Sequence, residues 1–153
     1  MAETNVVATL AELIRINSIN PAYDNGRPES EVIGYIERFF VERGIETWRQ
    51  EVLPDRPNLI ARLPGRSSGR RVVLEAHVDT ASITGMTIPP LEPAIRNNLM
   101  YGRGSCDTKA GLAAMMHAVA SLHKEGAPQG RLRDQHGGVA DYARPSGLLD
   151  CES

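Results

Sequence analysis

The sequence predicts an α/β fold in which helices pack on a mixed sheet. Apolar residues recur at three- and four-residue spacing in three stretches, which predicts three amphipathic helices. Between the second and third stretches lie short apolar segments separated by loops that contain proline and glycine, a pattern typical of strands. The order helix, helix, strand, strand, strand, loop, helix therefore indicates a layered α/β architecture.

Each predicted helix has one apolar face. The first helix begins at Val6 and ends near Asn17. The second follows a turn-rich stretch that contains prolines and an Asn-Gly pair, and its apolar residues fall within 32–40. The third begins at Lys109 and ends near Gly126, and its methionines are most simply core residues.

The predicted strands lie at residues 45–52, 58–63 and 71–76. The last of them contains the apolar run Val-Val-Leu at 72–74, which predicts a strand buried on both faces of a sheet covered by helices. Residues 81–97 are expected to form a long, proline-rich loop without regular structure. Loops of this length within a compact domain usually serve a function.

Bulk composition limits the classes of partner. The chain has 153 residues, of which 41% are hydrophobic, so it can bury one ordinary core. A net charge of −2 gives no basic footprint, so we expect neither nucleic acid nor a membrane surface as a partner. The chain shows no signal peptide or membrane-spanning run, which predicts a cytoplasmic protein. Cys106 and Cys151 are expected to be reduced thiols.

The segment RVVLEAHVDT places His77 and Asp79 directly after the third predicted strand. Open α/β sheets bind ligands at the carboxyl ends of their strands, so this is a favourable position for a site. Residues two apart on an extended chain point to the same side, which lets the carboxylate orient the imidazole. A hydrogen-bonded histidine at a strand end remains the alternative interpretation.

The segment YGRGSCDTKAG places Asp107 at the start of the third predicted helix. An aspartate there can be an ordinary N-cap, because the helix dipole and unpaired backbone N–H groups favour a carboxylate. A phosphate-binding loop is a poor match. Thr108 stands where a Walker loop needs glycine before lysine, and Asp107 stands where a dinucleotide fingerprint needs its third glycine.

Together, the two segments resemble one family. A His-x-Asp-Thr and a Gly-Arg-Gly-x-x-Asp-x-Lys that opens a helix are joined here by a proline-rich loop. This combination is similar to the zinc-dependent superfamily of acetylornithine deacetylase, succinyl-diaminopimelate desuccinylase, aminoacylase, carboxypeptidase G and related di- and tripeptidases. The resemblance extends from Leu10 to Gly130. It implies that residues 1–130 are the N-terminal part of a di-zinc hydrolase catalytic domain whose lid domain is absent.

The resemblance also implies a role for each matching residue. His77 would bind one zinc ion, Asp79 would orient the His77 imidazole, and Asp107 would bridge two Zn²⁺ ions, with Co²⁺ as an alternative metal. Imidazole and carboxylate groups are both good zinc ligands. The peptide bond between Asp107 and Thr108 is expected to be cis. Ala110 stands where the family usually has glycine, which is a mild departure.

The pattern changes after Gly130. Family members continue with an apolar strand that ends in an acidic pair, one member of which is the general base. This chain has no such pair, so the general base is not present in it. Residues 131–153 have no sustained helical or strand period, which we interpret as a frameshifted tail, with a natural disordered tail as the alternative. The site is expected to exclude the late candidate ligands His136, Asp150, Cys151 and Glu152.

The resemblance implies metal-dependent hydrolysis of an amide bond. The leading interpretation is deacylation of a small N-acyl amino acid, similar to acetylornithine deacetylase. The first alternative is a metallopeptidase of the same superfamily that cleaves a short peptide, and the second is a non-catalytic, truncated α/β domain. We expect weak or absent turnover from this chain alone, and a homodimer for the intact protein.

Overall fold

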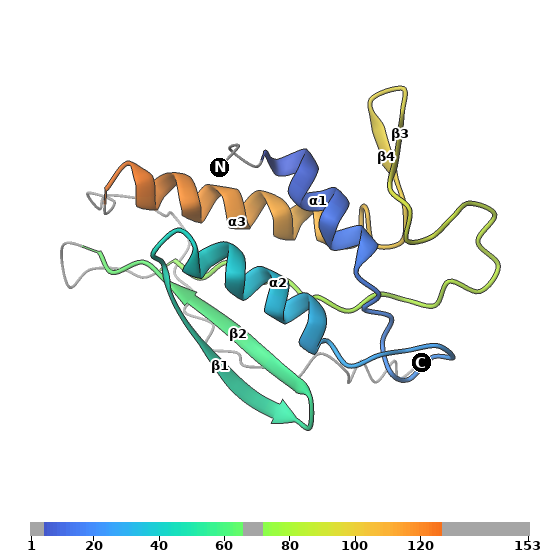
Figure 1. Cartoon of the computed structure of the whole chain (residues 1–153), viewed down its shortest axis with the longest axis horizontal. Coiled ribbons are helices and arrows are strands. Elements are labelled where there is room, and N and C mark those ends of the chain that lie inside the picture. Colours follow the sequence, from blue (N-terminus) through green and yellow to red (C-terminus); the bar gives the residue numbers. More distant parts are fainter. Residues whose placement is uncertain (1–4, 66–71, 127–153) are drawn as a thin grey trace, which may run out of the picture.

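A computed structural model of the chain describes residues 5–65 and 72–126 (Figure 1). Those residues hold two helices, then two strand hairpins and then a third helix, which confirms the predicted α/β class. The predicted boundary after residue 130 and the tail at 131–153 lie outside the described residues. The elements are α1 (Val6–Arg15), α2 (Ser30–Val41), β1 (Glu46–Leu53), β2 (Arg56–Arg62), β3 (Ala94–Arg96), β4 (Leu99–Tyr101) and α3 (Lys109–Lys124).

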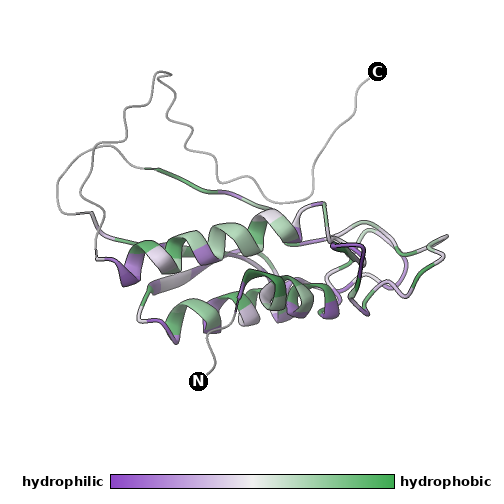
Figure 2. Cartoon of the chain, turned by 90° about the horizontal axis from the view of Figure 1, so that it is seen from above, coloured by the Kyte–Doolittle hydropathy of each residue, from purple (hydrophilic) through white to green (hydrophobic). Residues whose placement is uncertain are grey.

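All three predicted helices are present, and each buries an apolar face. α1 packs on α3, and α2 packs on both α3 and the β1–β2 hairpin. Hydrophobic and hydrophilic residues lie on different sides of the helices (Figure 2). None of the described helices is long and apolar enough to cross a membrane. The buried core cluster consists of Leu13, Val32, Ile36, Phe39, Phe40, Ile45, Leu112, Ala113 and Met116.

The first two predicted strands form one antiparallel hairpin. Its register runs from the pair Glu46 and Arg62 to the pair Leu53 and Arg56. Asp55 in the connecting turn has a φ of 59°, a left-handed conformation that aspartate tolerates better than most residues. The hairpin lies against α2 (Figure 1), which contacts both of its strands.

The prediction of a doubly buried strand at residues 71–76 is wrong for the part that the structure describes. Residues 72–79 form no ladder, and the side chains of Val72, Val73 and Leu74 are 66%, 75% and 51% exposed. A strand buried on both faces needs neighbours on each side. The described strands pair only within their own hairpins, and the parallel pairing among described residues is an isolated bridge between Ile19 and Thr80.

The predicted loop at 81–97 is irregular over most of its length, but its end is not. β3 pairs with β4 in a short hairpin that projects from the helical body (Figure 1). Asn97 and Asn98 between them have φ values of 51° and 63°. Positive φ at both central positions suits a two-residue hairpin turn, and asparagine tolerates it. The Asn-Asn pair was therefore a hairpin signal at the end of the stretch expected to be a loop.

Candidate metal centre

The end of α1 and the residues after it hold the segment that carries His77. Thr80 N–H donates to Ser18 O at 2.8 Å, and Asn20 N–H donates to Thr80 O at 2.9 Å. The Ser18 hydroxyl donates to Val78 O at 2.8 Å. Residues 78–80 are therefore fixed by two backbone hydrogen bonds and one side-chain hydrogen bond to residues 18–20, even though they belong to no sheet.

The same end of α1 holds the segment that carries Asp107. Lys109 is 1% exposed, and its Nζ donates to Leu13 O at 2.7 Å and to Ile16 O at 3.0 Å. These carbonyls belong to the last turn of α1, where backbone acceptors lack helical partners. Lys109 thus joins the C-terminal end of α1 to the N-terminal end of α3, and both candidate ligand segments meet there.

The glycine-rich motif allows a close approach at this junction. Gly104 has a φ of +78°, and a Cβ atom added to it would lie 2.8 Å from Thr80 Cγ2 and 3.1 Å from Lys109 Cδ. A side chain at this position would therefore clash with Thr80 and Lys109, and the backbone would be strained. Glycine is required here by contact with the His77 segment, which explains one of the two glycines in the motif.

The three residues predicted for the site lie together. His77 Nε2 is 3.2 Å from Asp107 Oδ1. On the other side of the ring, His77 Nδ1 is 3.0 Å from Asp79 O and 3.3 Å from Asp79 Oδ1. The peptide bond between Asp107 and Thr108 is cis, as the resemblance implied. Of the side chains, Asp107 is 89% exposed, His77 43% and Asp79 17%, so the site opens to solvent on the Asp107 side.

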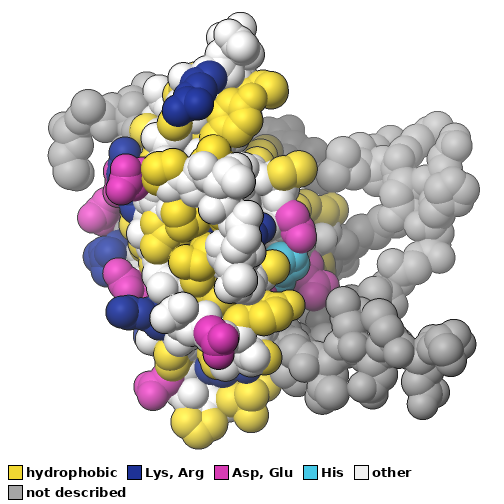
Figure 3. Space-filling model, turned by 90° about the vertical axis from the view of Figure 1, so that its right-hand side faces the viewer, with side chains coloured by type: hydrophobic (Ala, Val, Ile, Leu, Met, Phe, Trp, Pro, Cys, Tyr) yellow, Lys and Arg dark blue, Asp and Glu magenta, His cyan; other side chains and the backbone are white. Residues whose placement is uncertain are grey.

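The exposed side of this cluster carries little else that could complete a ligand set. Among the described residues no group of three or more His, Cys, Asp or Glu side chains could hold a metal ion. Figure 3 shows a histidine side chain at the surface beside acidic side chains. Cys106 is a free and exposed thiol, as predicted, whereas Cys151 and the other late candidates lie outside the described residues.

A small pocket adjoins Asp107. It has a volume of about 180 Å³ and is lined by Ala81 and residues 102–107. Pockets for small-molecule ligands usually have volumes of about 300–1,000 Å³, so this one can hold only part of a substrate. Arg103 in its wall donates from Nη2 to Ser82 O at 2.5 Å, and its Nε is buried without a partner among the described residues.

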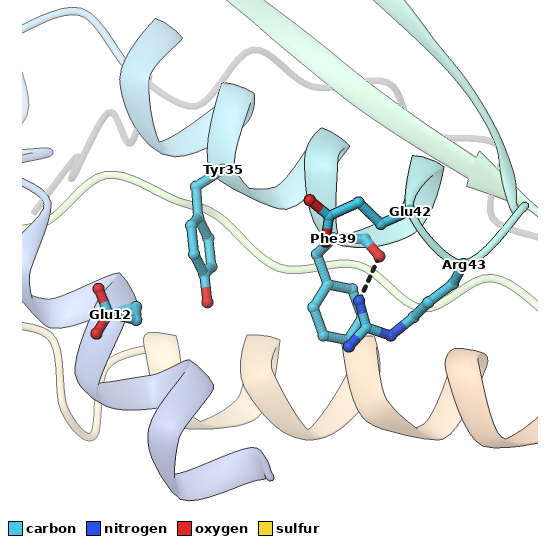
Figure 4. Close-up of a pocket in the computed structure, with 5 residues that line it drawn as sticks. All are labelled: Glu12, Tyr35, Phe39, Glu42 and Arg43. Carbon is cyan, nitrogen blue, oxygen red and sulfur yellow. Dashed lines mark hydrogen bonds between the residues drawn. The ribbon is translucent and has the colours of Figure 1, made fainter. Parts of the chain in front are cut away.

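A larger pocket of about 260 Å³ lies between α1 and α2 and contains none of the predicted site residues (Figure 4). Arg43 lies 3.7 Å from the centre of the Phe39 ring and donates to Phe39 O at 2.7 Å. Glu12 accepts a hydrogen bond from Arg15 at 2.6 Å. Because Arg43 and Glu12 already have partners within the chain, this pocket is a weaker candidate for a charged ligand.

Two residues of the site were missed by sequence reasoning. Asn20 donates from Nδ2 to Asp79 Oδ2 at 2.7 Å across 59 positions, and Lys109 is buried although a lysine at a helix start usually lies in solvent. Neither contact has a periodic signal in the sequence. In the sequence, only the position of Lys109 within the glycine-rich motif suggested that its side chain has a structural role.

Lys109 is expected to make stability depend on pH. Burial lowers the pKa of Lys109 from 10.5 to about 8. Between those two pH values the unfolded chain holds a proton that the folded chain has lost, so the free energy of unfolding rises with pH across this window. The size of the pKa shift limits this rise to about 3 kcal/mol. The two carbonyl acceptors of Lys109 stabilise its charged form and make the rise smaller.

The Lys109→Met variant provides the comparison, because it keeps the length of the side chain without its charge. Urea unfolding of both proteins from about pH 7.5 to about pH 10 should show the wild type gaining stability relative to the variant as pH increases. A constant difference across this range would show that Lys109 keeps an ordinary proton affinity in the folded state.

One family model matches the part of the chain that carries the cluster. Residues 73–133 match the model of a family described as peptidase family M20/M25/M40. The matched stretch includes all three clustered residues, His77, Asp79 and Asp107.

Three curated relatives are similar to parts of the chain. An N-formyl-4-amino-5-aminomethyl-2-methylpyrimidine deformylase from Halalkalibacterium halodurans is 33% identical over 94 residues, which cover 58% of this chain and 22% of the relative. Succinyl-diaminopimelate desuccinylase from Gluconacetobacter diazotrophicus is 44% identical over 72 residues, covering 46% and 18%. Succinyl-diaminopimelate desuccinylase 2 from Ruegeria sp. is 29% identical over 147 residues, covering 92% and 35%. The chain thus spans 18–35% of the length of these relatives.

Proposed function

We propose that the chain supplies His77 and Asp107 to the metal site of an enzyme that hydrolyses amide bonds, a proposal that the match of residues 73–133 to the peptidase family M20/M25/M40 supports. Two observations support the proposal together: the family match and the cluster of His77, Asp79 and Asp107 near the end of α1. Asp79 is proposed to orient His77 by contact with its Nδ1 atom, as the resemblance implied. The relatives named desuccinylase and deformylase support an acyl-amide substrate.

The main observation behind the proposal is the short distance between His77 Nε2 and the Asp107 carboxylate. Asp79 O is a carbonyl oxygen and can only accept, so a hydrogen bond at 3.0 Å requires the proton on His77 Nδ1. A neutral imidazole then turns the Nε2 lone pair toward the Asp107 carboxylate, 3.2 Å away. Two electron-pair donors at this distance repel each other unless a cation or a second imidazole proton lies between them.

The donor set suits zinc. Ligand atoms 2.0–2.2 Å from a tetrahedral zinc ion lie about 3.4 Å from each other, close to the observed separation of Nε2 and Oδ1. When bound, zinc would supply a Lewis acid that polarises the amide carbonyl and acidifies water. His77 and Asp107 would hold the ion, and Asp79 would keep the proton on Nδ1 so that Nε2 remains a ligand. Co²⁺ accepts the same donors and is the alternative metal.

The proposed substrate is a small N-acyl amino acid. The names of two relatives point to an N-succinyl group, whereas the resemblance in the motifs pointed to an enzyme similar to acetylornithine deacetylase. Both substrates have an amide bond next to a short acyl group. The pocket of about 180 Å³ beside Asp107 has room for a group of that size but not for a whole dipeptide with its side chains.

A chimeric enzyme tests the proposed chemistry. Residues 73–133 of this chain would replace the matching residues of the desuccinylase from Gluconacetobacter diazotrophicus, and release of succinate would be measured with Zn²⁺ or Co²⁺. We expect hydrolysis that a chelator abolishes, and a loss of kcat of about a hundredfold or more in the Asp107→Asn form of the chimera.

The matched control is Glu125→Gln in the same chimera, because Glu125 is exposed and lies at the C-cap of α3, at the opposite end of that helix from Asp107. This variant should leave kcat unchanged. A folded chimera without activity, next to an active parent enzyme, would contradict the proposed function.

A further inference from the structure

β1 is an edge strand. Among the described residues it pairs with β2 alone, in a two-stranded sheet, and Figure 1 shows it along the rim of the described part of the chain. The outer side of such a strand carries unpaired backbone N–H and C=O groups, which can pair with a strand of another molecule. Many edge strands are protected by being very short, but β1 has eight residues. Its side chains therefore decide which strand can pair with it.

One face of β1 carries two opposite charges. Arg49 lies on the α2 side, where its Nε and Nη2 atoms donate to Glu37. Glu51 follows two residues later on the same face, is exposed, and makes no hydrogen bond among the described residues. The hydrogen bond to Glu37 is the main cause of the raised pKa of Arg49, and the charges of Glu37 and Glu51 add to it. Glu51 thus lies near Arg49 and is available to a further cation.

The other face of β1 carries exposed apolar surface. Trp48, the single tryptophan of the chain, is 41% exposed and faces Ile60 of β2 across the hairpin. Val52 lies further along β1 and is partly buried. On its outer side Trp48 has no strand beside it among the described residues. A strand placed there would cover part of the indole ring.

The order of these residues is self-complementary. Two copies related by a twofold axis pair antiparallel, so residues equally far before and after a central residue face each other. With Gln50 at the centre, Arg49 faces the partner's Glu51, and the four charges around the axis alternate in sign. Trp48 faces the partner's Val52. A centre at residue 49 or 51 would instead place like charges directly opposite each other, which destabilises pairing. Of the registers centred on a residue, the one at Gln50 places Arg49 against a glutamate.

We propose that a second copy of this chain pairs with the free edge of β1, antiparallel and centred on Gln50, to form a four-stranded sheet across a dimer. The register of β1 is irregular between Glu51 and Leu53, so the paired stretch is short and the interface small. Small interfaces are typical of transient contacts, and we therefore expect a weak dimer that exchanges with the monomer. None of the three residues of the candidate metal centre takes part, so the proposal goes beyond the proposed function and does not depend on it.

Sedimentation equilibrium of the full chain measures the association, at concentrations from about 10 μM to about 1 mM, a range that covers weak binding. A reductant is present, so that the exposed thiol of Cys106 cannot link two chains. We expect a dimer and no larger species, because twofold pairing uses one edge of each copy. The fluorescence emission of Trp48 should shift to shorter wavelength in step with dimer formation, since the partner covers part of its indole ring.

Two charge variants test the register. Glu51→Arg places an arginine opposite Arg49 at both symmetric positions and should weaken dimer formation by about tenfold or more. Glu37→Arg/Arg49→Glu reverses the ion pair between α2 and β1, places a glutamate opposite Glu51, and should weaken its own dimer to a similar extent. An equimolar mixture of the two variants should associate again, because every charge at the edge then faces an opposite one.

The matched control is Glu92→Arg, the same substitution at an exposed residue in the loop before β3, which lies away from the β1–β2 hairpin (Figure 1). It should dimerise like the wild type, and circular dichroism checks that each variant is folded. A wild type that stays monomeric over the whole range, or a dimer that Glu51→Arg leaves unchanged, would overturn the proposal. A dimer that forms without a shift in Trp48 emission would do the same, because the contact would then lie on another surface.

Discussion

Replacing His77 by glutamine is expected to weaken binding of Zn²⁺ to the chain by about a hundredfold or more. Loss of residues that only orient a metal ligand typically weakens binding 10–100-fold, so loss of a ligand itself should cost at least as much. Glutamine keeps a polar side chain of similar length but lacks a nitrogen lone pair. Competition with a chromophoric chelator measures the affinity.

His123→Gln is the control for this prediction. His123 lies in the last turn of α3, whereas His77 faces residues at the opposite end of that helix. A rise of 1.5 Å per residue over the 14 positions from Lys109 separates the two ends by about 21 Å. Similar losses in the two variants would mean that Zn²⁺ binds histidines in general rather than the cluster at His77.

Replacing Arg56 by methionine is expected to lower the free energy of unfolding by about 3–5 kcal/mol. Arg56 donates from Nε and Nη2 to the two carboxylate oxygens of Glu29, at 2.7 and 2.6 Å. The Glu29 side chain is 3% exposed, and the hydrogen bond to Glu29 is the main reason why the pKa of Arg56 is raised. Without the guanidinium, a buried carboxylate loses its partner. Urea unfolding measures the loss.

The reverse change should cost less. After Glu29→Met, Arg56 can turn toward water, because its side chain is already 19% exposed. The double variant Glu29→Met/Arg56→Met should lie closer to the wild type than Arg56→Met does, since no buried charge remains. If the double variant is less stable than Arg56→Met, the ion pair matters for reasons other than the burial of Glu29.

The helices could be predicted because each one buries a face that the sequence marks by periodicity. The predicted first helix from Val6 to near Asn17 corresponds to α1, and the third, from Lys109, corresponds to α3. Periodicity reports burial within one element and needs no knowledge of its neighbours. The two strands of the β1–β2 hairpin were predicted from the loops with proline and glycine that bound them, and the structure adds their antiparallel pairing.

The strand predicted at 71–76 shows that an apolar run in the sequence carries no information about which strands would pair with it. A run of Val-Val-Leu indicates burial on both faces only if strands lie on each side, and the described residues place none there. Pairing is a property of the whole sheet rather than of the segment. β3 and β4 were missed for the opposite reason, since a three-residue strand is too short to show an alternating pattern.

The site was predictable only in part. His77, Asp79 and Asp107 were found because two short motifs carry them, and the structure brings the three side chains together. Asn20 and Lys109 were not found, because their hydrogen-bond partners, Asp79 and Leu13 O, are distant in the sequence and no sequence pattern links them. The metal roles of His77 and Asp107 remain predictions.

A double-mutant cycle for Zn²⁺ binding tests most directly whether His77 and Asp107 hold one metal ion together. Zn²⁺ is titrated calorimetrically into the wild type, His77→Gln, Asp107→Asn and the double variant. If both residues bind the same ion, either single change removes most of the affinity and the second adds little, so the losses in binding free energy are not additive. Additive losses, or wild-type affinity in the double variant, would contradict a shared site.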